Sequence, residues 1–288
     1  MRMSACTLRQ WNATFEHELT HLYPREECRR FVSMLAEHYC KWSRTKQLTS
    51  ADETLPPHAN QQFGIILEGL KQARPIQHLI GEAWFMERPF SVSSDVLIPR
   101  PETEELVHHI VNDNQCPNPT ILDIGTGSGC IAISLKMMIP HATVSAWDIS
   151  EKALTLAREN AQRHHCDVLF SRTDVLTQNP DKGEQYDIVV SNPPYICEQE
   201  KKLMHANVLK HEPHLALFVP DSDPLLFYRT IARLAQTILK PSGKLYFEIN
   251  EAYGTETANM LTSMGYINID ILNDLQGKQR MLRAHRQP

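Results

Sequence analysis

The sequence predicts an α/β fold with a mainly parallel sheet that carries helices on both faces. From residue 120 onward, short apolar runs that are typical of buried strands alternate with stretches of helical periodicity. Polar residues follow several of these runs directly, where the carboxyl ends of parallel strands would lie. The first 78 residues show helical spacing only. We therefore expect a small helical domain before the α/β domain.

Apolar residues recur at helical spacing from Glu27 through Trp42 and again between Phe63 and Leu70. Short β-like segments around Glu87-Arg88-Pro89 indicate a hairpin. We therefore expect three parts, namely an N-terminal helical domain over residues 1–78, a β-hairpin linker over residues 79–98 and the α/β domain over residues 99–288.

The third part contains the alternating elements. Strands are predicted over residues 120–122, 142–147, 167–170, 186–190, 244–249, 265–272 and 280–283. Helices are predicted over residues 103–111, 130–138 and 225–239, with another that starts near Ser150.

Composition excludes several classes of protein. The chain has 288 residues, of which 42% are hydrophobic, and no apolar run long enough to span a membrane. No signal sequence is recognisable, so we expect a cytoplasmic protein without membrane contact. We expect no metal site, because the seven cysteines form no CxxC pair. The closest histidines are adjacent in the sequence, and adjacent side chains diverge on a helix. No basic stripe with interleaved aromatic residues occurs, so we expect no direct nucleic-acid binding.

A glycine-rich loop follows the strand at residue 120 and precedes the helix at residue 130. Glycines allow positive φ angles and a close approach of the backbone to a ligand. They stand at alternate positions, whereas a dinucleotide fingerprint has the spacing G-x-G-x-x-G. Alternate glycines resemble the S-adenosylmethionine loop of class I methyltransferases. The residues predicted to contact this cofactor are Gly125, Thr126, Gly127, Ser128 and Gly129.

Acidic residues end the next two strands. Asp148 lies about twenty residues beyond the loop, where a carboxylate can bind ribose hydroxyls. Its alternative role is to stabilise the first turn of the helix that begins near Ser150. Asp174 and Val175 follow the third strand, in the expected neighbourhood of an adenine ring. The alternative for this pair is an ordinary loop acid and a packing valine.

The tetrapeptide Asn192-Pro193-Pro194-Tyr195 follows another apolar strand. Two prolines fix two φ angles and remove two backbone donors, so this corner presents carbonyl acceptors without N–H groups. The oxygens of the Asn192 side chain and the Pro193 backbone can each accept one proton from a planar NH₂ group. This arrangement suits methylation of an amide or an exocyclic amine. The alternative is a turn that merely ends a strand.

With these motifs the chain resembles the peptide chain release factor glutamine N5-methyltransferases. The resemblance is carried further by the segments Pro75–Gly81, Leu97–Glu104 and Asp274–Arg280. It implies a seven-stranded class I, Rossmann-like methyltransferase domain. It also implies methyl transfer from S-adenosylmethionine, which leaves S-adenosylhomocysteine, to the side-chain amide of the glutamine in the Gly-Gly-Gln loop of bacterial class I release factors. That modification tunes translation termination.

The resemblance assigns roles to residues of both motifs. Gly125 to Gly129, Asp148, Val175 and Asn192 would surround the cofactor. Asn192, Pro193, Pro194 and Tyr195 would hold the substrate glutamine, and Tyr195 would pack against its amide plane. The N-terminal helices would recognise the release factor or, alternatively, stabilise the catalytic domain. We expect a monomer.

Some positions depart from the family pattern or have two possible roles. His211 stands where relatives commonly have an aromatic residue, and Val175 stands where some have an aromatic residue near the adenine. Arg100 and Glu102 would either close the cofactor pocket or form an ion-paired turn. An adenine-N6 nucleic-acid methyltransferase would use the same corner on a flipped base. The motifs are also compatible with methylation of a glutamine in another protein and with a binding module that lacks catalysis.

Overall fold

The computed structural model of the protein describes residues 6–177, 185–204 and 206–288. These residues form two compact units. The first contains the described residues up to Gly81 together with the short segment that ends at His211, and the second contains the rest. Each unit has its own hydrophobic core.

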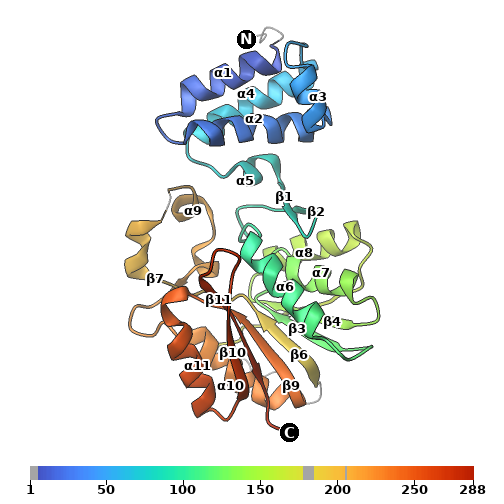
Figure 1. The fold of residues 1–288 in the computed structure, drawn as a ribbon, viewed down its shortest axis with the longest axis vertical. Helices are drawn as coiled ribbons and strands as arrows, with labels where there is room; N and C mark the ends of the chain where they lie inside the picture. The colour runs from blue at the N-terminus through green and yellow to red at the C-terminus, as the bar shows by residue number, and fades with distance from the viewer. Residues whose placement is uncertain (1–5, 178–184, 205) are drawn as a thin grey trace. The chain divides into compact units, whose positions relative to one another are not determined.

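The first unit is helical, as the sequence predicts (Figure 1). Its helices are α1 (Leu8–Leu19), α2 (Arg25–Cys40), α3 (Arg44–Thr49), α4 (Pro57–Lys71), α5 (Ile76–Ile80) and α9 (Ala206–His211). Helices α1, α2 and α4 pack together, and the aromatic rings of Trp11, Phe15 and Phe63 touch one another in their core. The Trp11 indole donates to the buried Asn60 side chain at 2.7 Å, which satisfies the indole N–H inside this core.

A β-hairpin opens the second unit. Strands β1 (Glu82–Phe85) and β2 (Arg88–Ser91) pair antiparallel around a turn at Met86 and Glu87, both of which have positive φ angles. The buried Asn160 side chain binds both backbone groups of Ser91 and so anchors the hairpin to its own unit. The hairpin was predicted as a linker, and the domain limits at residues 78 and 98 stay predictions.

The second unit contains the expected mainly parallel sheet, which has seven strands. Its order is β10 (Ile267–Asn273), β11 (Gln279–His285), β9 (Leu239–Glu248), β6 (Tyr186–Ser191), β3 (Thr120–Ile124), β4 (Thr143–Asp148) and β5 (Leu169–Arg172). Strand β11 is antiparallel to both of its neighbours, and the other pairs are parallel. The carboxyl ends of β4, β3, β6 and β9 therefore meet at one edge.

Helices cover both faces of the sheet, as predicted (Figure 1). One face carries α6 (Pro101–Asp113), α7 (Cys130–Met138) and α8 (Glu151–Arg163), and the other carries α10 (Leu226–Ile238) and α11 (Gly254–Ser263). The remaining elements are the strand pair β7 (Ile196–Cys197) and β8 (Phe218–Val219) and the 3₁₀ helices η1 (Glu198–Leu203), η2 (His214–Ala216) and η3 (Glu251–Tyr253). Among the described residues, no helix has both the length and the apolar character that a membrane span requires.

One strand begins earlier than predicted. β9 starts at Leu239 rather than at Lys244, because Leu239 pairs with Tyr186 before the register shifts. Pro241 and Gly243 lie within this extension and locally favour a turn, which is why the sequence pattern alone starts the strand after them.

Candidate active site

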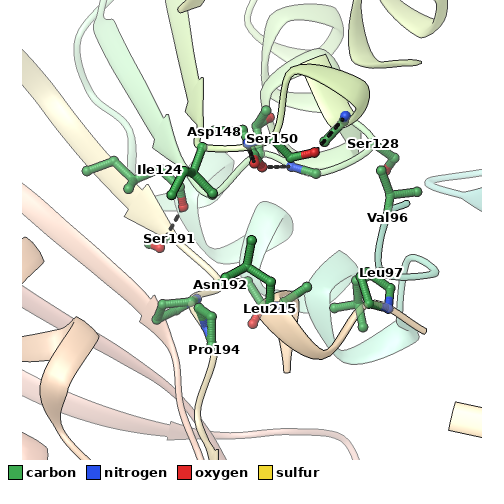
Figure 2. Close-up of a pocket in the computed structure, with 18 of the residues that line it drawn as sticks. Val96, Leu97, Ile124, Ser128, Asp148, Ser150, Ser191, Asn192, Pro194 and Leu215 are labelled. Carbon is green, nitrogen blue, oxygen red and sulfur yellow. Dashed lines mark hydrogen bonds between the residues drawn. The ribbon is translucent and has the colours of Figure 1, made fainter. Parts of the chain in front are cut away.

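A pocket of about 280 Å³ lies at the carboxyl edge of the sheet in the second unit. The segments that follow β3, β4, β5 and β6 all contribute to its lining. Figure 2 shows Asp148 and Ser150 on one side of the pocket and Asn192, Pro194 and Leu215 on the opposite side, with Val96 and Leu97 along a third side at the right of the view. Ligands in open α/β sheets bind at this edge, so the pocket is the candidate active site.

The glycine-rich loop forms one wall through Gly125, Thr126, Gly127 and Ser128. Gly125 and Gly127 have φ angles of 76° and 55°, and a Cβ atom on either would meet no atom within 4 Å. Their backbone is thus open to a ligand. Gly129 does not line the pocket. It caps α7 with a φ angle of 81°.

Packing explains the glycine at position 129. A Cβ atom there would lie 2.9 Å from the Ile133 side chain and 3.2 Å from Ala157 of α8. Any larger residue would therefore push α7 and α8 apart. This third glycine allows the two helices to pack closely, which differs from the cofactor contact that the sequence motif suggests.

Asp148 ends β4 and lines the pocket. One carboxylate oxygen accepts the backbone N–H of Gly127 at 2.9 Å and the other accepts that of Ser150 at 2.9 Å. Burial raises the pKa of Asp148, and these backbone donors oppose the increase. Ser150, rather than Asp148, is the N-cap of α8, because its hydroxyl accepts the Ala153 N–H. The carboxylate therefore joins the glycine loop to the start of α8 and still borders the pocket.

Asp174 and Val175 line the pocket from the turn after β5. The Asp174 carboxylate accepts the Leu176 N–H at 2.9 Å and the Thr177 hydroxyl at 2.8 Å, so it shapes its own turn. Val175 is partly buried against the core beneath α10. This arrangement brings an apolar side chain and an acidic turn to the same wall.

Asn192, Pro193 and Pro194 line the opposite wall, directly after β6. The Asn192 Nδ2 group donates to the Thr103 hydroxyl at 3.3 Å. Tyr195 does not line the pocket, because its hydroxyl points to Glu248 and donates to Oε1 at 3.1 Å. Three of the four residues of the corner thus line the pocket, and the fourth, Tyr195, binds Glu248 behind it.

Two functional candidates, Thr103 and Glu248, were not identified from the sequence. Both are buried, and the Thr103 hydroxyl donates to Glu248 Oε2 at 2.6 Å. Burial raises the pKa of Glu248, while the Thr103 and Tyr195 hydroxyls act in the opposite direction. The available signal was an acidic residue directly after the apolar run Leu245–Phe247, in the strand beside the one that Asn192 follows.

Arg100 combines both roles that the sequence left open. It lines the pocket and pairs with the buried Glu212 at 2.7 Å, while the Ile98 N–H donates to the same carboxylate at 3.3 Å. Glu102 does not line the pocket. His211 belongs to the first unit, where its Nε2 atom lies 3.1 Å from the Gln72 carbonyl oxygen.

These walls fit an adenosine-containing methyl donor. An exposed glycine backbone and a carboxylate stand on one side, apolar side chains lie between, and oxygen acceptors stand opposite. A carboxylate at the second strand end suits ribose hydroxyls, and Val175 and Phe227 offer apolar contact for a ring.

Comparisons with known proteins agree with this fit. The model of the methyltransferase small domain matches residues 101–216, and that of the PrmC N-terminal domain matches residues 10–81. Chains named release factor glutamine methyltransferase from Bacteroides thetaiotaomicron and Flavobacterium psychrophilum are 45% and 42% identical to this chain. The first alignment covers 95% of this chain and 98% of the relative, and the second covers 96% and 99%.

A solved methyltransferase from Pyrococcus furiosus shares the fold at a TM-score of 0.52 and 16% identity, over 69% of this chain and 89% of that one. The fold, the two matched domains and the near-complete alignments agree. The chain belongs to the release factor glutamine methyltransferases, a family of S-adenosylmethionine-dependent protein methyltransferases.

Proposed function

We propose that this protein methylates the side-chain amide nitrogen, N5, of the glutamine in the Gly-Gly-Gln loop of bacterial class I release factors. It would act in the cytoplasm, where these factors work, and would tune translation termination. The observation that carries the proposal is the position of Asn192 and Pro193 in one pocket with the glycine loop and Asp148. The names of the relatives support the substrate class.

S-adenosylmethionine would supply an activated methyl group on a sulfonium. The cofactor would lie close to the open backbone at Gly125, Thr126, Gly127 and Ser128. Asp148 has two carboxylate oxygens at the pocket, each with one lone pair used by a backbone N–H and a second available for a ribose hydroxyl. Asp174 and Val175 would border the adenine. Asn192 would contact both the cofactor and the substrate.

A primary amide is a poor nucleophile, because its lone pair is delocalised into the carbonyl. Positioning must therefore supply most of the rate enhancement. The Asn192 Oδ1 atom and the Pro193 carbonyl would accept the two amide protons and hold the nitrogen in the plane that they define. As positive charge develops on that nitrogen, the same two oxygens stabilise it as preorganised dipoles. The product nitrogen then loses a proton to water, so a dedicated strong base is not required.

Pro194 and Tyr195 would complete the corner. Pro194 stiffens the backbone beside the acceptors. The Tyr195 hydroxyl donates to Glu248, so we assign Tyr195 the support of the corner from behind rather than a contact with the amide plane.

Mass spectrometry of a purified class I release factor, incubated with this protein and S-adenosylmethionine, tests the proposal. We expect one added methyl group on the glutamine of the Gly-Gly-Gln loop. A factor with that glutamine replaced by alanine is the matched control and should gain none. Asn192→Ala should abolish turnover, because one of the two amide acceptors is lost. Methylation of adenine in single-stranded DNA instead of the factor would support the nucleic-acid alternative, and labelling of neither substrate would contradict the proposal.

We also propose that the N-terminal helical unit recognises the release factor. Deletion of residues 1–78 should reduce the rate on whole factor far more than the rate on a peptide of its Gly-Gly-Gln loop. Equal losses on both substrates would favour a role of these helices in stability only.

A further inference from the structure

We propose that Thr103 and Glu248 are positioning residues that determine which end of the Asn192 side-chain amide faces the substrate. This inference rests on the proposed role of Asn192 as an acceptor of the substrate amide protons. An asparagine amide has an acceptor end and a donor end of nearly equal size. Only the acceptor end can bind an incoming NH₂ group, so a rotation of 180° would turn the site from attractive to repulsive.

The three side chains form one continuous chain of hydrogen bonds. Asn192 Nδ2 lies 3.3 Å from Thr103 Oγ1, and that hydroxyl lies 2.6 Å from Glu248 Oε2. Thr103 belongs to α6, Glu248 ends β9 and Asn192 follows β6, so three rigid elements hold the chain. Thr103 is 3% exposed and Glu248 is 1% exposed, so water does not compete for these bonds.

The direction of these bonds follows from the number of protons available. An ionised carboxylate only accepts, so the single hydroxyl proton of Thr103 must point to Glu248. The Thr103 oxygen can then only accept a hydrogen bond. Asn192 must therefore present its NH₂ group to Thr103, which leaves Oδ1 for the pocket. The orientation of the amide is thus imposed from the far side of the hydroxyl.

Two hydroxyl groups and one positive charge around Glu248 favour an accepting, ionised carboxylate and oppose the effect of burial. Tyr195 donates to the second carboxylate oxygen at 3.1 Å, and Arg280 acts on the carboxylate as a nearby positive charge. Glu102 is the opposing negative charge. Burial is the largest influence and leaves the pKa of Glu248 raised, whereas Thr103, Tyr195 and Arg280 oppose that rise. Both oxygens therefore receive a hydroxyl proton, as an acceptor-only carboxylate requires.

The same carboxylate connects residues of two of the three family-like segments with the proline corner. Thr103 lies in the segment Leu97–Glu104, Tyr195 closes the proline corner and Arg280 ends the segment Asp274–Arg280. These pieces are far apart in the sequence and meet around Glu248. Their common effect is to keep a polarised hydroxyl behind Asn192.

Glu248→Gln tests the inference, because glutamine has nearly the same shape as glutamate but can donate a hydrogen bond to the Thr103 hydroxyl instead of accepting one. The new amide can donate to Thr103, whose proton then turns to Asn192 Oδ1 and lets the Asn192 NH₂ group face the pocket. We expect kcat on the release factor to fall roughly 100-fold, the effect of losing one preorganised group. The affinity for S-adenosylhomocysteine should change by less than about threefold, since Glu248 does not line the pocket.

Two further variants separate positioning from a structural role. Thr103→Val removes the hydroxyl, and in the double variant with Glu248→Gln no proton can turn to Asn192. The double variant should therefore be more active than Glu248→Gln alone, whereas independent effects on stability would add. Thr103→Ser keeps the hydroxyl and should retain kcat. Thr257→Val is the matched control, because Thr257 is also buried and its hydroxyl donates to a backbone carbonyl away from the pocket.

A readout without catalysis keeps the two proposals distinguishable. In the wild type, the Asn192 Nδ2 protons should show a nuclear Overhauser contact with the Thr103 methyl group, and in Glu248→Gln that contact should be lost. Retention of both the contact and kcat in Glu248→Gln would overturn the inference. The inference would also be overturned if the fold-loss of kcat in the double variant equalled the product of the fold-losses in the two single variants. If the wild type leaves release factor unmodified, the proposed function fails, while the Overhauser contact still decides the inference.

Discussion

Replacement of Asp148 by asparagine should weaken binding of the cofactor before it affects the chemical step. In the structure, the two carboxylate oxygens of Asp148 each accept one backbone N–H, from Gly127 and from Ser150. The proposed ribose hydroxyls would donate to the remaining lone pairs. Asparagine removes the charge and replaces one acceptor oxygen by an NH₂ group. The NH₂ group would face one of the two backbone N–H donors without forming a hydrogen bond, and it could not accept a hydrogen bond from the second ribose hydroxyl.

The magnitude follows from these contacts. A hydrogen bond to a charged group contributes about 1.5–3 kcal/mol. Asp148→Asn loses one such bond and weakens the other, so we expect about 2–3 kcal/mol of lost binding free energy. Since about 1.4 kcal/mol corresponds to a tenfold change, the Kd should rise roughly 30- to 150-fold. Burial already raises the pKa of Asp148, so wild-type affinity should also fall as the pH drops through that raised pKa and the acceptor is protonated.

Isothermal titration calorimetry with S-adenosylhomocysteine measures this effect directly. Asn192→Ala is the matched comparison, because Asn192 lines the opposite wall of the same pocket. It should keep its affinity within several-fold and lose turnover instead. Thermal unfolding of both variants shows whether the fold is intact. An unchanged Kd in Asp148→Asn would refute the assignment to ribose, and equal losses of affinity in both variants would refute the division of the pocket into a cofactor wall and a substrate wall.

Two further predictions concern stability. Gly129→Ala should destabilise the protein more than Gly127→Ala in urea unfolding, because only at 129 does the new Cβ meet a neighbour, Ile133, at 2.9 Å; equal losses would show that the positive φ angles alone matter. Asp123 is a fully buried residue of β3, two positions before Gly125, and burial raises its pKa to about 7. As the pH falls, the folded protein therefore binds this proton at a higher pH than the unfolded chain does. Stability should therefore fall by about 1.4 kcal/mol per pH unit as the pH rises from about 5 to about 7. Asp123→Asn should flatten that slope, and an unchanged slope would contradict the raised pKa.

Local patterns predicted the parts of the site that depend on neighbours in the sequence. Asp148 and Asn192 were placed at strand ends because apolar runs precede them, and both line one pocket. The same reasoning could not tell which motif residues point inward. Gly129 caps a helix and Tyr195 turns to a buried carboxylate, although both belong to motifs whose other members line the pocket. Side-chain direction within a loop depends on tertiary contacts that a local pattern does not contain.

Thr103 and Glu248 could not be predicted in this way, because 145 positions separate them in the sequence. Their contact depends on the order of the strands, which places β9 directly beside β6. In that register Ser191 pairs with Phe247, so Asn192, which follows the end of β6, lies at the same edge of the sheet as Glu248, the last residue of β9. A buried acid at a strand end costs free energy unless its oxygens are satisfied, and here two hydroxyls satisfy them. From this position the carboxylate binds the hydroxyl behind Asn192 and does not line the pocket. We therefore expect the loss of Glu248 to affect turnover more than cofactor affinity.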